Sequence, residues 1–119
     1  MKLIKFAIAG LALSSTVSLA SDCQPPSKPA LPDGASASME QMIEGQKAVK
    51  TFQASLMEYL QCLEVEMTAA QTAAEAGTDG AAETYKGIEE TYNAGVSMEE
   101  ELAGQFNTEI REYKAANPS

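Results

Sequence analysis

The chain has 119 residues, enough for one small domain, and carries 17 acidic residues against eight basic ones, a net charge of −9. This acidity argues against nucleic acid and anionic membrane surfaces as partners, because both would repel the chain. The sequence contains no histidine. That excludes imidazole-based triads, imidazole haem or zinc sites, and the commonest general base.

Residues 1–20 have the pattern of a secretory signal peptide. Lys2 and Lys5 form a basic start, residues 6–13 are apolar, and small residues at positions −3 and −1 end the segment at Ala20. The apolar run is shorter than the roughly 20 residues that a membrane span needs. We therefore predict a soluble periplasmic or secreted protein with no membrane anchor in its mature form, a retained anchor being the alternative. Cleavage removes both lysines and makes the net charge −11.

Residues 21–37 form a segment rich in proline, serine and alanine that contains Cys23. Its closely spaced prolines exclude a helix and favour an extended polyproline II arm, with a turn at residues 32–34. The second cysteine is Cys62. Two cysteines in an exported protein suggest one disulfide, Cys23–Cys62, and the alternatives are an intermolecular bridge or two free thiols.

Residues 38–76 show the period of an amphipathic helix. Ser38 followed by Gln41 is a capping box, and Glu40 suits the positive end of the helix dipole. Apolar residues recur at a spacing of seven, as in a coiled coil. This main column consists of Met42, Val49, Leu56, Leu63 and Ala70, and Phe52 and Tyr59 fill the partner positions.

The sequence at 77–80 predicts a turn between this helix and a second one at 81–116. Gly77 fits a helix C-cap, and Thr78 or Asp79 fits the N-cap of the second helix. Gly95 lies inside the second helix, where glycine costs roughly 1 kcal/mol. A kink or a restart is therefore predicted near residues 95–97, and we favour one bent helix.

Two long helices with a short connection must run antiparallel. The predicted fold is therefore all-α: a coiled-coil-like antiparallel hairpin at 38–119, with the arm at 21–37 stapled to it by the disulfide. The fifteen residues from Cys23 to Ser38 span about 46 Å as polyproline II, whereas Cys62 lies roughly 36 Å along the helix. The arm can thus fold back along the helix, and Leu31 is expected near Gly45–Ala48. The alternative is a loose tether.

No residue pattern indicates catalysis, a cofactor or a metal. The acidic runs at 88–90 and 99–101 are interpreted as solvated helix faces, because consecutive helical residues point in different directions. Asn107 and Arg111 share one helical face near the start of the first helix. Arg111 is expected to form an ion pair with Glu40 or Glu44. The alternative is a recognition patch, whose candidate residues are Asn107, Arg111 and Tyr113.

The arm sequence "CQPPSKPALPDG" (23–34), the helix that follows it, and "FNTEIREYK" (106–114) together resemble an uncharacterised family of small exported helical proteins of proteobacteria. The resemblance covers most of the mature chain. It implies a periplasmic or secreted setting and brings no activity or site residue. The sequence thus favours a non-enzymatic interaction or structural protein that acts as a homodimer or with an unidentified protein partner. The alternative is a carboxylate-based cation-binding protein.

Overall fold

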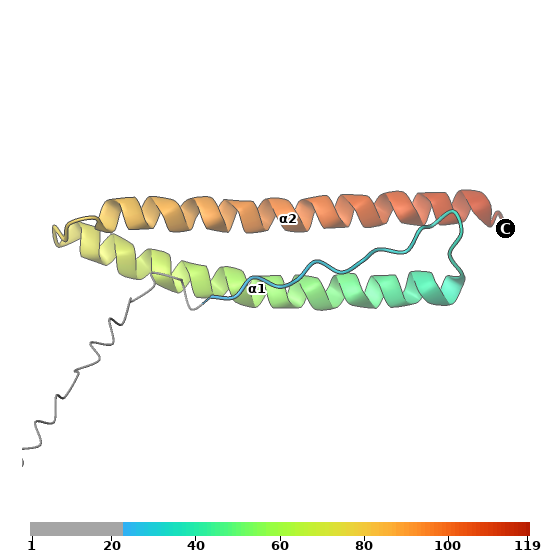
Figure 1. Ribbon diagram of the computed structural model, residues 1–119, viewed down its shortest axis with the longest axis horizontal. Helices are drawn as coiled ribbons and strands as arrows, with labels where there is room; N and C mark the ends of the chain where they lie inside the picture. The colour runs from blue at the N-terminus through green and yellow to red at the C-terminus, as the bar shows by residue number, and fades with distance from the viewer. Residues whose placement is uncertain (1–22) are drawn as a thin grey trace, which may run out of the picture.

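A computed structural model describes residues 23–119, so the predicted signal peptide at 1–20 lies outside the described residues. Helix α1 (Met39–Glu75) and helix α2 (Ala81–Ala116) lie antiparallel and pack against each other (Figure 1). The part of the chain from residue 23 onward contains no strand. The predicted all-α hairpin with a disulfide-stapled arm is therefore confirmed.

Helix α1 begins as its sequence predicts. The Ser38 side chain accepts a hydrogen bond from the Gln41 backbone N–H at 3.2 Å, and the Gln41 side chain accepts one from the Ser38 N–H at 2.8 Å. These two bonds satisfy backbone donors that have no partner within the helix. The capping box thus fixes where the chain leaves the arm and enters α1.

The turn between the helices depends on two glycines with positive φ, Gly77 at 79° and Gly80 at 78°. The α1 C-cap residue is Ala76 and not Gly77, and Gly77 follows it in the left-handed conformation that ends many helices. The prediction of Thr78 or Asp79 as the next N-cap is wrong. The N-cap is Gly80, which makes no side-chain capping bond, because the chain enters α2 through a left-handed conformation that glycine adopts without strain.

The core is a single stripe between the two helices. Every member of the predicted α1 column is buried, and Leu56 and Leu63 are each only 1 % exposed. Burial of these side chains is the main source of hairpin stability, because a lone helix in water is marginal. Besides that column, the buried hydrophobic residues are Cys23, Phe52, Tyr59, Ala81, Leu102 and Phe106.

Helix α2 passes through Gly95 without interruption, so the favoured prediction of one helix is confirmed and the alternative, a restart near residues 95–97, does not occur. Gly95 is buried, and a Cβ atom there would lie 3.0 Å from Leu60 Cδ2 and 3.6 Å from Tyr59 Cε1. Contacts at 3.0–3.4 Å are tighter than most real Cβ contacts. The glycine therefore lets α1 side chains pack directly on the α2 backbone, and this packing compensates for its poor helix propensity.

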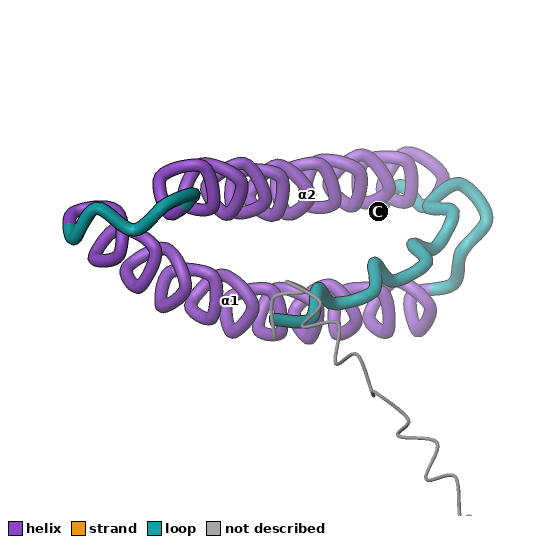
Figure 2. Tube along the Cα trace, turned by 60° about the vertical axis from the view of Figure 1, so that its left-hand side comes forward, coloured by secondary structure: helices purple, strands orange, loops and turns teal. Residues whose placement is uncertain are grey.

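The arm follows α1 from about its middle to its N-terminal end (Figures 1 and 2). Leu31 and Pro32 line a groove together with Gly45 and Ala48, which confirms the expected position of Leu31. A Cβ on Gly45 would lie 2.8 Å from Pro32 Cδ, so the proline ring occupies the space that a side chain would need. The arm is thus a packed element and not a loose tether.

The arm ends in a turn that contacts α2. The Asp33 carbonyl accepts hydrogen bonds from Ser36 N–H at 3.1 Å and from Ala37 N–H at 2.8 Å, so the turn begins at Asp33 and extends beyond the predicted residues 32–34. The Gly34 N–H donates to Glu109 Oε2 at 3.2 Å. The turn therefore bridges the open end of the hairpin and holds the arm against both helices.

Replacing Gly34 with alanine should destabilise the protein by about 1–3 kcal/mol, the usual cost of overpacking. A Cβ at this position would overlap the Glu109 carbonyl oxygen and approach the Tyr113 backbone nitrogen to 2.9 Å, and backbone atoms cannot rotate away. Gly104→Ala is the matched control. Nothing lies within 4 Å of its Cβ position, so this variant should gain up to about 1 kcal/mol. Urea unfolding measures both, and a neutral Gly34→Ala would contradict the close approach.

Candidate functional site

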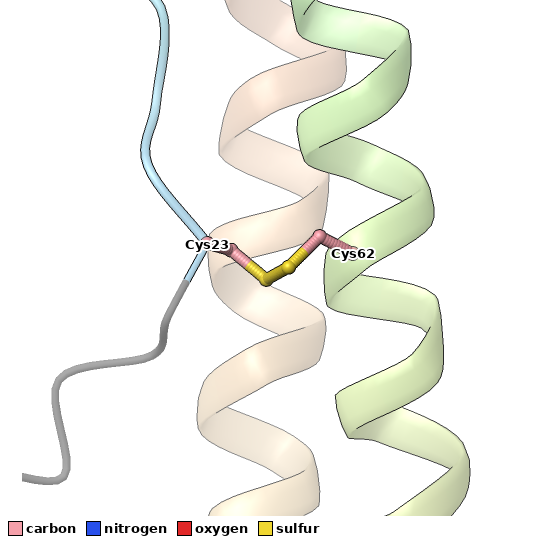
Figure 3. Close-up of a disulfide and its surroundings, with 2 residues drawn as sticks. All are labelled: Cys23 and Cys62. Carbon is pink, nitrogen blue, oxygen red and sulfur yellow. A yellow bond between two sulfur atoms is a disulfide. The ribbon is translucent and has the colours of Figure 1, made fainter.

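The disulfide fixes the start of the arm to the middle of α1. Cys23 and Cys62 point toward each other from the arm and from α1 (Figure 3). Their Cα atoms are 5.7 Å apart, which lies within the usual range for a disulfide. Cys23 is only 6 % exposed and belongs to the hydrophobic core cluster. The predicted pairing is therefore present, and its first half-cystine also serves as a core residue.

A groove of about 730 Å³ lies between the arm and α1. Its volume is that of a small-molecule site. Among the described lining residues, Glu58 is the one carboxylate, and both lining cysteines belong to the disulfide. The chemical groups present can thus form apolar contacts and a few hydrogen bonds, but they include no thiolate or imidazole nucleophile. The apolar lining includes Pro25, Pro26, Pro29, Phe52 and Tyr59.

The three residues of the predicted recognition patch do not form one surface. Arg111 and Asn107 are exposed, whereas Tyr113 is half-buried and packs against the core. Arg111 Nη2 donates to Thr108 Oγ1 at 3.2 Å. Within residues 23–119, Arg111 makes no ion pair with Glu40 or Glu44, so the predicted tie is wrong. The Arg111 guanidinium instead forms a hydrogen bond within its own helix.

Two polar ties join the helices on the flank that the arm does not cover. Tyr92 Oη donates to Glu64 Oε1 at 3.1 Å, and Gln53 Nε2 donates to Glu99 Oε1 at 2.9 Å. The bond to Glu64 and the charge of that carboxylate raise the pKa of Tyr92. These contacts agree with the antiparallel register, which places Glu64 opposite residues near 92.

Three carboxylates converge at the open end of the hairpin, where the arm turn meets α2. One oxygen from each of Asp33, Glu109 and Glu112 lies within 4.8 Å of the others. The neighbouring Glu109 carboxylate raises the pKa of Glu112, and burial and Asp33 act in the same direction. Exposed acidic groups of this kind are common without a bound cation, so the cluster alone does not support the cation-binding alternative.

Glu112→Gln should stabilise the protein near pH 7, because it removes a charge that Glu109 and Asp33 repel. A carboxyl group with a raised pKa in the folded state contributes stability below its unfolded pKa of about 4.3, and that contribution is lost as the pH rises. The difference in melting temperature between Glu112→Gln and the native chain should therefore be larger at pH 7 than at pH 4. Glu100→Gln, an exposed change elsewhere on α2, is the control. A difference independent of pH would contradict the repulsion.

Sequence reasoning missed this acidic cluster and placed its acidic candidates at 88–90 and 99–101. The signal was present in part, because the turn at 32–34 and the direction of the arm were both predicted. The α2 residues that the turn meets follow only when the predicted arm is continued past the start of α1. Gly34 is the residue that permits the approach, since its missing side chain makes room for the Glu109 backbone.

The largest exposed hydrophobic side chains of the described residues all belong to α1. They are Met39 at 63 %, Ile43 at 45 %, Met57 at 62 % and Val65 at 71 % exposed. None of them lines the groove beside the arm. Isolated exposed apolar residues are normal, but the concentration of these four on one helix makes that helix the candidate contact surface.

Comparisons with known proteins identify no relative. No family model, no curated protein and no solved structure matches the chain. In the part of the chain described, neither helix is apolar enough over a sufficient length to cross a membrane.

Proposed function

We propose that the protein is a non-enzymatic helical protein of the periplasm or the extracellular space that acts by presenting the outer surface of α1 to a protein partner. The disulfide is compatible with a location outside the cytoplasm, where such bonds persist. The signal-peptide pattern at 1–20 supports export in the same way.

One observation carries this proposal: the arm covers one flank of α1 and leaves large apolar side chains exposed on the remaining surface. The covered flank includes Ala48, Ser55 and Cys62, which line the groove beside the arm. The exposed side chains include Met57 and Val65. A contact with another protein would remove these side chains from water, which is the favourable term in most protein association.

Site-specific photo-crosslinking in the cells that produce the protein tests the proposal. A photoreactive amino acid in place of Met57 or Val65 should yield crosslinked protein adducts. The same probe at Gln105, an exposed polar position on α2, is the matched control and should yield few. Equal yields at all three positions, or no adduct at Met57 and Val65, would contradict a contact surface on α1.

A further inference from the structure

The outer surface of α1 carries a column of residues with opposite charges on the two sides of Met57. Ile43, Lys50, Met57 and Glu64 recur at a spacing of seven, and all four are exposed. Residues at this spacing lie on the same side of a helix. Their position rotates by about 20° around the helix with every seven residues, which suits a partner helix that crosses at an angle. We name these four residues the outer column. Met57 lies between a cation seven residues before it, Lys50, and an anion seven residues after it, Glu64.

This order makes the outer column complementary to itself. If a second copy of α1 lies antiparallel with its Met57 facing Met57, Lys50 lies level with Glu64 of the partner subunit. The twofold symmetry repeats this pair on the other side of Met57. Each pair is displaced from the centre by seven residues, or about 10.5 Å along the helix. The same patch on both copies is the arrangement that a symmetric dimer requires.

The surroundings of the outer column favour this contact in a protein that is otherwise strongly acidic. Its charged neighbours on α1 at spacings of three and four are Glu40 and Lys47, one of each sign, and the others are uncharged. The acidic cluster at Asp33, Glu109 and Glu112 lies elsewhere, where the arm turn meets α2. A net charge of −9 opposes self-association. A contact between two copies is therefore favoured at a surface where positive and negative side chains are equal in number. The uncharged neighbours are Met39, Gln46, Gln53, Ala54, Leu60, Gln61, Met67 and Thr68.

The outer column is accessible to a second chain without the loss of any contact within the first chain. The arm does not cover Lys50, Met57 or Glu64. All three are exposed, and none of them lines either groove beside the arm. Glu64 accepts from Tyr92 through Oε1, which leaves Oε2 for a lysine. The disulfide also remains intramolecular in such a dimer, since Cys62 lies on the flank that faces the arm.

We infer that the partner of the outer column is a second copy of this chain, bound antiparallel through Met57–Met57 contact and two Lys50–Glu64 ion pairs. This inference rests on the proposed function, which it makes specific by naming the partner. The Met57 side chains supply the apolar contact. The two charge pairs set the antiparallel orientation and the register, as interfacial charges do in paired helices.

Charge reversal with rescue tests the inference by light scattering and sedimentation of the oxidised protein over a range of concentrations. The native chain should give twice the mass of one chain. Lys50→Glu and Glu64→Lys should each weaken the dimer by about tenfold or more, because each replaces two attractions with two repulsions. The double variant K50E/E64K should restore the native dimer constant within about threefold, since the pair is then reversed but complementary. Met57→Asp should give a monomer.

The controls separate the dimer from folding and from the proposed function. Circular dichroism should show every variant helical, and Tyr92→Phe removes the hydroxyl that Glu64 accepts from while leaving the dimer constant unchanged. A monomeric native chain, or a double variant no tighter than Lys50→Glu, would overturn the inference. If the chain is a monomer but a probe at Met57 still crosslinks to a different protein, the proposed function stands and only the identity of the partner is wrong.

Discussion

Replacing Cys23 and Cys62 together with serine should lower the free energy of unfolding by about 4 kcal/mol. The bridge joins residues 39 positions apart, and in the chain-entropy model a loop of this size accounts for a loss of about that magnitude. In a domain of this length the melting temperature should fall by about 15–30 °C. The change should be large because a hairpin with one core stripe has no second layer to support it.

Thermal melts of the serine variant and of the native chain in reductant measure this effect. Both should shift downward by similar amounts, because both remove the covalent link. Cys23 is also a buried core residue, so the serine variant should be the less stable of the two. Melts that coincide with that of the oxidised native chain would show that the link contributes nothing to stability.

Leu56→Ala should have an effect of the same order, about 2–5 kcal/mol. Leu56 is 1 % exposed, and its Cδ1 lies 3.8 Å from where a Cβ on Gly95 would be, at the close approach of the helices. Truncation there removes buried apolar area and leaves a cavity, because the two helix backbones are already close together and have little freedom to collapse further.

Val65→Ala is the matched control for Leu56→Ala, because it truncates another apolar residue of α1. Val65 is 71 % exposed, so its loss should change the free energy of unfolding by less than about 0.5 kcal/mol. Urea unfolding at low protein concentration measures both variants as monomers. Similar losses in the two variants would mean that Leu56 is not at the centre of the core.

Much of this fold is predictable from local physics. The seven-residue apolar column from Met42 to Ala70 predicts both the length of α1 and its buried face. Ser38 and Gln41 predict where the helix begins, because their side chains satisfy its first backbone donors. Two cysteines in a chain with an export signal predict the Cys23–Cys62 bridge, and the reach of the extended arm permits it and predicts the position of Leu31.

The details that differ from the sequence predictions depend on tertiary geometry, which local patterns do not contain. Gly80 takes the N-cap of α2 in place of Thr78 or Asp79 because the connection requires a positive φ. Gly95 lies within one helix, as favoured from the sequence, and the structure adds that α1 side chains pack on it. Arg111 bonds to Thr108 and not to Glu40 or Glu44, since a long side chain on an exposed face has several partners of similar energy.

The candidate site is less predictable than the fold. The acidic cluster requires the arm turn and two α2 residues to meet, and the pattern of neither segment alone contains that information. The outer column is visible in the sequence as Ile43, Lys50, Met57 and Glu64. The sequence alone does not show that these residues are exposed. The structure shows this, because the arm covers a different flank of α1.

The most direct measurement of the arm's position is a nuclear Overhauser effect between the ring protons of Pro32 and the α protons of Gly45 in the oxidised protein. Pro32 Cδ lies 2.8 Å from the position that a Gly45 Cβ would take, so these protons should give a strong signal. We expect that signal in the oxidised protein and its loss in urea. Its absence in a folded, oxidised sample would contradict an arm packed along α1.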